Sequence, residues 1–300
     1  MRIDERLTDG GPSFSFEFFP PKTEDGERNL AAALDELSGM DPTFVSVTYG
    51  AGGTLAQREK TIDIVTGIKA DHGLEAMAHF TCVNATTQEL RATLDRMRDA
   101  GIENVLALRG DPPQGESEWT ATDGGLRYSR ELIELIRTDY PEFAIGAACF
   151  PEVHIHAESP ESDLRYLKEK VDAGAGFLIT QLFYDNRCYY EFVERAREIG
   201  IDVPIIPGIM PITNAGQIRK ITSMCGSDIP AQLQAELELR ADDPAAATDF
   251  GVAYATLQCA DLLAKGAPGI HFYTLNRSPA TRAILSALRC QVPWQGAVPV

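Results

Sequence analysis

The stretch SFSFEFF (13–19) alternates small or polar residues with phenylalanine. Successive side chains of a β-strand point to opposite faces, so the alternation predicts a strand with its phenylalanines on one face. Ser13, Ser15 and Glu17 then lie on the other face. An amphipathic pattern typical of a helix follows at 24–39. A strand followed by a helix indicates a unit of a parallel sheet.

The same order of strand and helix recurs along the whole chain. Seven further strands are predicted at 43–48, 75–82, 104–109, 143–149, 177–183, 204–209 and 269–274. Further amphipathic helices are predicted at 56–72, 86–101, 128–138, 161–174, 186–199, 214–226 and 279–289, with extra helices near 230–241 and 244–265 between the seventh and eighth strands. We therefore expect an α/β fold, a (β/α)8 TIM barrel, as a single catalytic domain over residues 1–300. An open doubly wound sheet is the alternative, but no strand is followed by the glycine pattern GxGxxG.

Composition and charge narrow the function classes. The chain has 44 acidic and 27 basic residues and a net charge of −17, which disfavours nucleic acid and anionic membranes as partners. No apolar run approaches the roughly 20 residues that span a bilayer, and the first ten residues lack the apolar stretch of a signal peptide, so we expect a cytoplasmic protein. The six cysteines form no CxxC pair, which is typical of reduced thiols.

Glu17 is the candidate proton donor. The active sites of β/α barrels lie at the C-terminal ends of the strands, and Glu17 falls near the end of the first one. An inward carboxyl group walled by aromatic residues is expected to have a raised pKa, which would allow it to donate a proton near neutral pH. The alternative is a structural pairing with an arginine on a neighbouring strand.

Other polar residues follow the predicted strands. Arg109 and Asp111 flank a glycine and could contact an anion or form a structural ion pair. Gln181 carries an amide suited to the edge of a heteroaromatic ring, and Arg277 could bind a carboxylate. His79, taken alone, is more typical of a core or capping histidine.

His154 and His156 suggest a second class of enzyme. Their HxH spacing occurs in metal-dependent barrel hydrolases. Such a site needs further ligands from other strands, whereas His79 and His271 are isolated in the sequence, so metal ligation is the less favoured hypothesis. The residues alone indicate a barrel enzyme for an anionic, partly aromatic ligand, with Glu17 as its proton donor.

Eight segments, taken together and in order, resemble one known family. They are SFEFFPPK (15–22), VTYGAGGT (47–54), HFTC (79–82), ALRGDPP (107–113), CFPEVHIHA (149–157), VDAGAGFLITQLFYD (171–185), IIPGIMPITN (205–214) and HFYTLNR (271–277). They resemble bacterial-type methylenetetrahydrofolate reductase over residues 13 to 289. The chain resembles the catalytic domain without the C-terminal regulatory domain of eukaryotic members.

The resemblance implies a (β/α)8 flavoprotein with noncovalent FAD. It implies reduction of 5,10-methylenetetrahydrofolate to 5-methyltetrahydrofolate by NADH or NADPH in a ping-pong scheme. Glu17 would be the general acid that protonates N10 of the folate, and Asp111 would act beside the flavin and the pterin. A homo-oligomer is expected from the resemblance alone. A barrel that binds folate or flavin without catalysis remains an alternative.

The resemblance also implies binding residues, each read from a matching position. The cofactor contacts would be Thr48, Tyr49, Ala51, His79, Arg109, Gly110, Asp111, Phe150, His154, Ala157, Asp163 and Lys170. The folate contacts would be Asp111, Gln181, Gln217 and Arg277, and no metal is expected. Four positions depart from the usual pattern, namely Phe150, Tyr166, Glu169 and Ile221. Because Glu169 replaces a basic residue near the FAD phosphates, we expect looser FAD binding.

Overall fold

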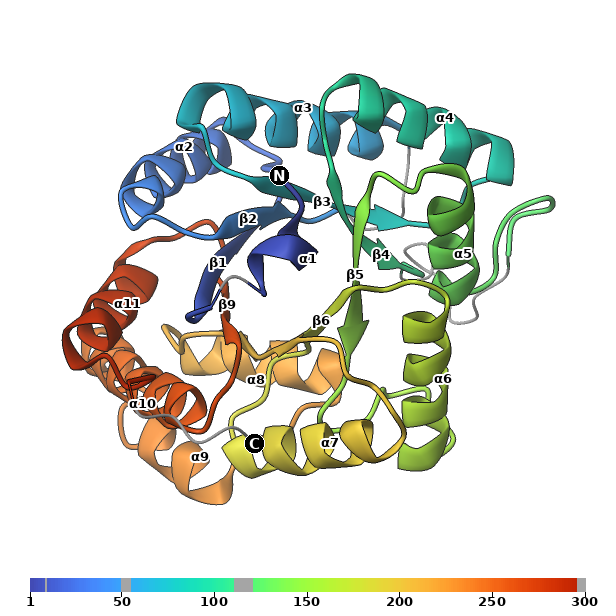
Figure 1. Cartoon of the computed structure of the whole chain (residues 1–300). Helices are drawn as coiled ribbons and strands as arrows, with labels where there is room; N and C mark the ends of the chain where they lie inside the picture. Colours follow the sequence, from blue (N-terminus) through green and yellow to red (C-terminus); the bar gives the residue numbers. More distant parts are fainter. Residues whose placement is uncertain (9, 50–54, 111–120, 296–300) are drawn as a thin grey trace.

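A computed structural model describes residues 1–8, 10–49, 55–110 and 121–295. Within these ranges the strands form one parallel sheet in the order β7-β6-β5-β4-β3-β2-β1-β9-β8, surrounded by a ring of helices (Figure 1). The strands are β1 (Ser13–Phe18), β2 (Phe44–Val47), β3 (Ala76–Thr81), β4 (Asn104–Leu108), β5 (Ala144–Cys149), β6 (Phe177–Thr180), β7 (Ile205–Ile206), β8 (Gly208–Ile209) and β9 (Gly269–Tyr273). The helices are α1 (Ile3–Arg6), α2 (Glu24–Ser38), α3 (Leu55–His72), α4 (Thr87–Asp99), α5 (Ser129–Asp139), α6 (Pro160–Asp172), α7 (Asn186–Glu198), α8 (Ala215–Cys225), α9 (Ala231–Glu238), α10 (Pro244–Ala264) and α11 (Pro279–Gln291).

A split strand completes the barrel. β6 pairs with β7, and β8 pairs with β9, so the two short strands together occupy the seventh position. Pro207 separates them because proline has no N–H to give to a sheet, while its carbonyl accepts a bond from His271 N at 2.9 Å. The predicted (β/α)8 fold is confirmed, including the extra helices α9 and α10 before the last strand.

One predicted strand was too long, and one helix was not predicted. The sixth strand was expected to reach residue 183 but ends at Thr180. The backbone N–H of Leu182 donates to Gln181 Oε1 at 2.9 Å. This N–H therefore bonds a neighbouring side chain and not an adjacent strand. The short helix α1 was not predicted.

The sheet separates two apolar clusters. The phenylalanines of β1 belong to the larger one, between the sheet and the surrounding helices, as the alternation predicts. A smaller cluster fills the interior, where Phe44, Met77 and Phe177 pack with Ile3 of α1. Ser15 and Glu17 therefore face the interior from a strand whose aromatic residues face the helices.

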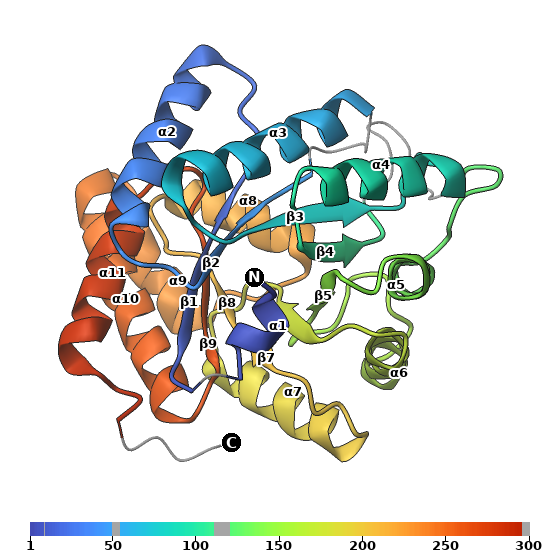
Figure 2. The ribbon, with the colours of Figure 1, turned by 45° about the horizontal axis from the view of Figure 1, so that its top comes forward.

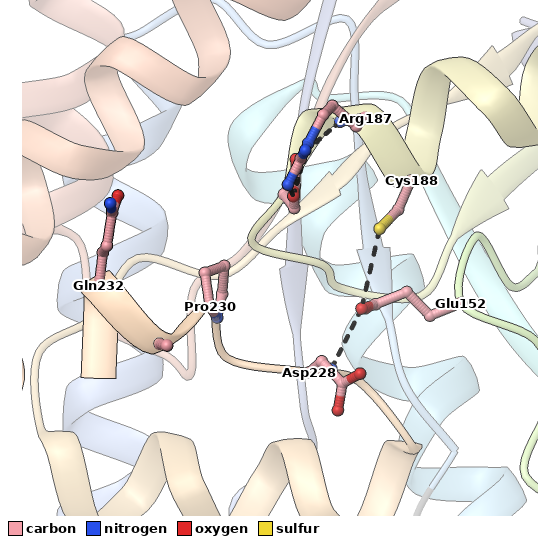
Figure 3. Close-up of a pocket in the computed structure, with 8 residues that line it drawn as sticks. Glu152, Arg187, Cys188, Asp228, Pro230 and Gln232 are labelled. Carbon is pink, nitrogen blue, oxygen red and sulfur yellow. Dashed lines mark hydrogen bonds and ion pairs between the residues drawn. The ribbon is translucent and has the colours of Figure 1, made fainter. Parts of the chain in front are cut away.

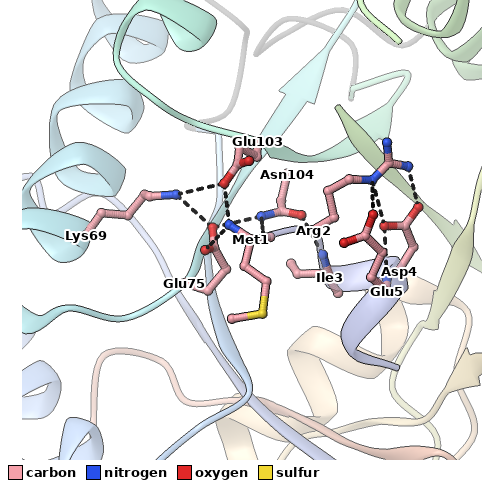
Figure 4. A network of polar contacts seen from close by, with 9 residues as sticks. All are labelled: Met1, Arg2, Ile3, Asp4, Glu5, Lys69, Glu75, Glu103 and Asn104. Carbon is pink, nitrogen blue, oxygen red and sulfur yellow. Dashed lines mark hydrogen bonds and ion pairs between the residues drawn. The ribbon is translucent and has the colours of Figure 1, made fainter. Parts of the chain in front are cut away.

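Helix α1 lies across the N-terminal end of the barrel, in the centre of the ring in Figure 1 and beside the strands in Figure 2. Figure 4 shows how it is held: Ile3 N donates to Asn104 Oδ1 at 2.8 Å, and Asn104 Nδ2 donates to Glu75 Oε1 at 2.9 Å. Lys69 Nζ and the amino group of Met1 also donate to Glu75, each at 2.8 Å. Ile3 is buried against the interior cluster, so α1 closes this end.

No helix in the described ranges has the length and apolarity to cross a membrane.

Candidate functional site

Glu17 lies inside the C-terminal end of the barrel between two histidines. Its side chain is 18% exposed, and its Oε2 is 3.3 Å from His79 Nε2 and 3.5 Å from His271 Nε2. His79 comes from β3 and His271 from β9, so three strands supply the cluster. These two histidines are isolated in the sequence, but the barrel brings both of them to Glu17.

The register of the sheet explains this meeting. Ser15 and His271 are partners across β1 and β9, and Glu17 is the partner of Tyr273. Since every second residue faces the interior, Ser15, Glu17 and His271 share one face. Thr274 Oγ1 donates to the backbone carbonyl of Glu17 at 2.6 Å, which fixes the end of β1.

The electrostatics of Glu17 differ from the prediction. Burial alone would raise the pKa of Glu17, but the interactions with His271 and His79 outweigh it and lower the pKa from 4.5 to about 2. The predicted raised pKa was wrong because the phenylalanines of β1 face the helices, so imidazoles and not phenyl rings adjoin the carboxyl group.

Two buried polar atoms of β3 have no partner in the described part of the chain. His79 Nε2, despite its closeness to Glu17, and Thr81 Oγ1 have no hydrogen-bond partner in the described ranges. Both come from β3 and are buried. Buried polar atoms are normally satisfied, so these two fit a bound molecule with its own donors and acceptors.

The turn after β4 requires a glycine. Gly110 has φ +90°, and a Cβ there would lie 2.5 Å from Val83 Cγ1. Arg109 is half-buried, and its Nε donates to Gly110 O at 3.3 Å. Two predicted site residues, Ala51 and Asp111, lie outside the described residues.

Four predicted cofactor residues come together after β5. The rings of Phe150 and His154 meet edge to face with centroids 4.6 Å apart, and His154 N donates to Asp163 Oδ2 at 3.1 Å. Lys170 Nζ lies 6.0 Å from the centre of the Phe150 ring and donates to Ala148 O at 2.9 Å. Burial lowers the pKa of His154 and that of Lys170. A fifth predicted residue, Ala157, donates its N–H to His154 O at 2.8 Å.

The hypothesis of a metal site at His154 and His156 gains no support. His154 Nδ1 accepts a hydrogen bond from His156 N at 3.1 Å, so one potential ligand atom already has a partner. His156 is exposed. Across the described part of the chain, no group of three or more His, Cys, Asp or Glu side chains is placed to hold a metal ion.

The remaining predicted residues are more dispersed. Gln181 directly follows β6 and is half-buried, and Thr48 directly follows β2. The ring of Tyr49 packs edge to face on Phe80. Gln217, in the first turn of α8, and Arg277, after β9, are both exposed.

Two of the unusual positions have structural partners. Glu169 Oε2 lies 3.5 Å from Arg130 Nε, so a cation from α5 adjoins the acidic residue. The guanidinium of Arg165 lies 5.0 Å from the ring centre of the exposed Tyr166.

A separate cavity of about 450 Å³ was missed by sequence reasoning because its walls come from three segments that are distant in sequence: the loop after β5, the start of α7 and the segment that leads into α9 (Figure 3). Glu152 accepts a bond from Asp228 N at 3.2 Å, and its Oε1 lies 3.9 Å from Cys188 Sγ. Burial raises the pKa of Glu152. Arg187 Nη2 lies 2.5 Å from Asp185 Oδ2.

Fold and site define a β/α-barrel protein with a carboxylate–imidazole cluster inside the C-terminal end of the barrel. The family described as methylenetetrahydrofolate reductase matches residues 2–289. This chain belongs to that family. It is 40% identical over 279 residues to the Escherichia coli (strain K12) 5,10-methylenetetrahydrofolate reductase, covering 93% of this chain and 91% of that protein.

A longer relative agrees with this assignment, and one solved structure shares the fold. The Arabidopsis thaliana protein named methylenetetrahydrofolate reductase (NADH) 1 is 41% identical over 312 residues, which is 98% of this chain. The chain spans only about half of that plant relative, 52% of its length. A Clostridium thermocellum protein, described as uncharacterized and as binding two copies of 5-methyl-5,6,7,8-tetrahydrofolic acid, has a TM-score of 0.66 at 15% identity, covering 98% of this chain and 99% of that one. At this identity the likeness concerns the fold alone.

Proposed function

We propose that this chain reduces 5,10-methylenetetrahydrofolate to 5-methyltetrahydrofolate with a reduced nicotinamide nucleotide and FAD. Membership of the family supports the reaction. The observation that carries it is the Glu17 carboxylate, which two imidazoles hold at the end of the barrel where such enzymes react.

Residues of β3, of the turn after β4 and of α6 suit FAD. The unpartnered polar atoms of His79 and Thr81 can bond a polar ring edge, and Arg109 and Lys170 supply positive charge for the phosphates. When bound, FAD would accept a hydride from the nicotinamide and pass it to the folate. The proposal keeps Asp111 as a second catalytic residue on the resemblance.

Glu17 is proposed as the general acid that protonates N10 of the folate. Without that proton the departing nitrogen would leave as an anion, which is costly in a site shielded from water. Since the pKa of Glu17 is about 2, its carboxyl group is ionised at neutral pH. Glu17 must therefore take up a proton before it can deliver one to N10.

The kinetic scheme that we propose is ping-pong, with the nicotinamide nucleotide and the folate bound in turn. The name of the Arabidopsis thaliana relative specifies NADH, which supports NADH as the donor.

Glu17→Gln tests the proposal because glutamine keeps the shape of the side chain without its acid. We expect flavin reduction by NADH to continue, while folate reduction in single-turnover mixing slows by about 10²- to 10⁴-fold. The exposed Glu142→Gln is the matched control. Equal loss of both half-reactions in the Glu17 variant would contradict the assigned role. A wild-type protein that binds flavin or folate but performs neither half-reaction would support the non-catalytic alternative.

A further inference from the structure

The loop after β5 contains a strained residue, Val153. Its φ is +71°, in the left-handed region that β-branched residues rarely adopt. Val153 joins two tight turns: its N–H donates to Phe150 O at 3.1 Å, and the carbonyl of the next residue, His154, accepts from Ala157 N at 2.8 Å. Such strain persists only where the surroundings hold the backbone in place, and it is concentrated at functional sites. The contacts on the two sides of Val153 therefore decide where His154 lies.

Glu152 holds the loop on the first side of Val153. Its Oε1 accepts a hydrogen bond from Asp228 N at 3.2 Å and lies 3.9 Å from Cys188 Sγ. Figure 3 shows its carboxyl group directed at both partners. Because Cys188 lies in α7 and Asp228 precedes α9, Glu152 ties the loop after β5 to two other segments of the chain.

Separate contacts hold the loop on the second side. His154 N donates to Asp163 Oδ2 at 3.1 Å. Gly226, the C-cap of α8 with φ +75°, packs so closely on Ile155 that a Cβ there would lie 2.2 Å from Ile155 Cγ2. The loop is thus fixed on both sides of Val153, which takes up the strain between them.

This loop borders the site proposed for FAD. Burial lowers the pKa of His154, and the charges of Arg109 and Lys170 act in the same direction, so the imidazole adjoins both of these cations. They are the cations that we propose for the phosphates. The Phe150 ring also lies beside Lys170. A change in the backbone at Val153 would move both rings relative to these cations.

We propose that Glu152 is a positioning residue of the cofactor site: by clamping the loop to Asp228 and Cys188, it keeps Val153 left-handed and so directs His154 toward FAD. This inference rests on the proposed function. An electrostatic role predicts the opposite effect, because a carboxylate near the cofactor repels the phosphates and its removal would strengthen binding. Without the clamp Val153 relaxes, and FAD must rebuild the turn in order to bind.

Variants of Glu152 test the clamp through the affinity for FAD, measured by dilution of the holoenzyme while the fluorescence of released FAD is followed. We expect Glu152→Ala to bind FAD about tenfold more weakly, the factor that corresponds to rebuilding one strained residue. Glu152→Gln keeps an oxygen that can accept from Asp228 N, so its affinity should stay within about twofold of the wild type. Glu158→Ala, which removes an exposed carboxylate from the same loop, is the matched control and should also stay within about twofold. Unchanged affinity in Glu152→Ala would overturn the proposal.

A second substitution at Val153 separates clamping from packing. Glycine adopts a positive φ without strain, so it should preserve the turn when the clamp is lost. We expect Glu152→Ala/Val153→Gly to recover an FAD affinity within about threefold of the wild type, and Val153→Gly alone to lie in the same range. A double variant that binds as weakly as Glu152→Ala would overturn the proposal, because a purely structural role of Glu152 is not rescued at Val153. If Glu152→Ala fails to fold, Glu152→Asp, whose shorter side chain withdraws the carboxylate, replaces it in the same comparison.

Imidazole ¹⁵N NMR adds a readout that does not depend on the cofactor. Without added FAD, the His154 signals should be shifted in Glu152→Ala and restored in the double variant, while the signals of His72 in α3 stay in place. Unshifted His154 signals in Glu152→Ala would overturn the proposal. If the wild type binds no FAD, the proposed function fails; if it binds FAD but Glu152→Ala binds it equally well, this inference alone fails.

Discussion

The acid stability of the fold tests the direction of the Glu17 pKa shift. Burial would raise the pKa of Glu17, but the two histidine contacts outweigh it and lower the pKa from 4.5 to about 2. A carboxyl group with a lower pKa in the folded state stabilises the fold above its unfolded pKa. That stabilisation is lost as the pH falls through the folded value.

The magnitude follows from the two pKa values. The fall from 4.5 to about 2, at about 1.4 kcal/mol per pH unit, corresponds to about 3 kcal/mol of unfolding free energy at pH 7. We therefore expect Glu17→Gln to be less stable than the wild type at pH 7 by up to that amount. The difference should shrink between about pH 5 and pH 2.

Urea unfolding at a series of pH values measures this difference. The exposed Glu142→Gln serves as the control and should follow the wild type throughout. A raised pKa would give the opposite result, because the wild type would then lose stability relative to Glu17→Gln as the pH rises toward neutrality. That outcome would refute the role assigned here to the two histidines.

Two further predictions concern the fold around the site. Gly110→Ala should cost about 2–5 kcal/mol of unfolding free energy, because a Cβ would add overpacking against Val83 to the strain of φ +90°. Gly101→Ala is the control: at φ +73° with no atom within 4 Å, it should cost only the backbone strain of about 1–2 kcal/mol. Equal losses of unfolding free energy in urea would argue against a steric clash between residue 110 and Val83. Ile3→Ala should cost about 2–5 kcal/mol because Ile3 is 1% exposed, whereas Ile199→Ala, at a side chain 41% exposed, should change stability by about 0.5 kcal/mol or less. Matching shifts of the melting temperature in those two variants would show that Ile3 does not stabilise the barrel.

Most of the fold could be predicted from sequence because each strand and helix has its own local signature. The alternation at 13–19 fixes which side chains of β1 face inward, and the structure confirms it. The short α1 has a single turn and no amphipathic repeat, so no local pattern predicts it. The extent of β6 depends on the side chain of Gln181, which a hydropathy pattern does not describe.

The site was predictable in its residue types but not in its electrostatics. The inward position of Glu17 follows from its own strand. Its pKa depends on His271, which is 254 residues away and adjoins it only because the barrel closes between β1 and β9. A sequence shows neither that closure nor the register of the strands. From the sequence alone, the two histidines therefore have no visible relation to Glu17, and its carboxyl group is expected to lie among aromatic residues. The cavity beside Glu152 escaped prediction for the same reason, since its wall comes from three segments that are distant in sequence.

Because α1 covers the N-terminal end, the barrel is open only at its C-terminal end. Ile3 fills the base, and the hydrogen bonds of Asn104 hold the helix there. Any molecule that reaches Glu17 must then enter and leave through the C-terminal end of the barrel. Under the proposed function, the nicotinamide nucleotide and the folate would therefore both approach Glu17 from the C-terminal end of the barrel.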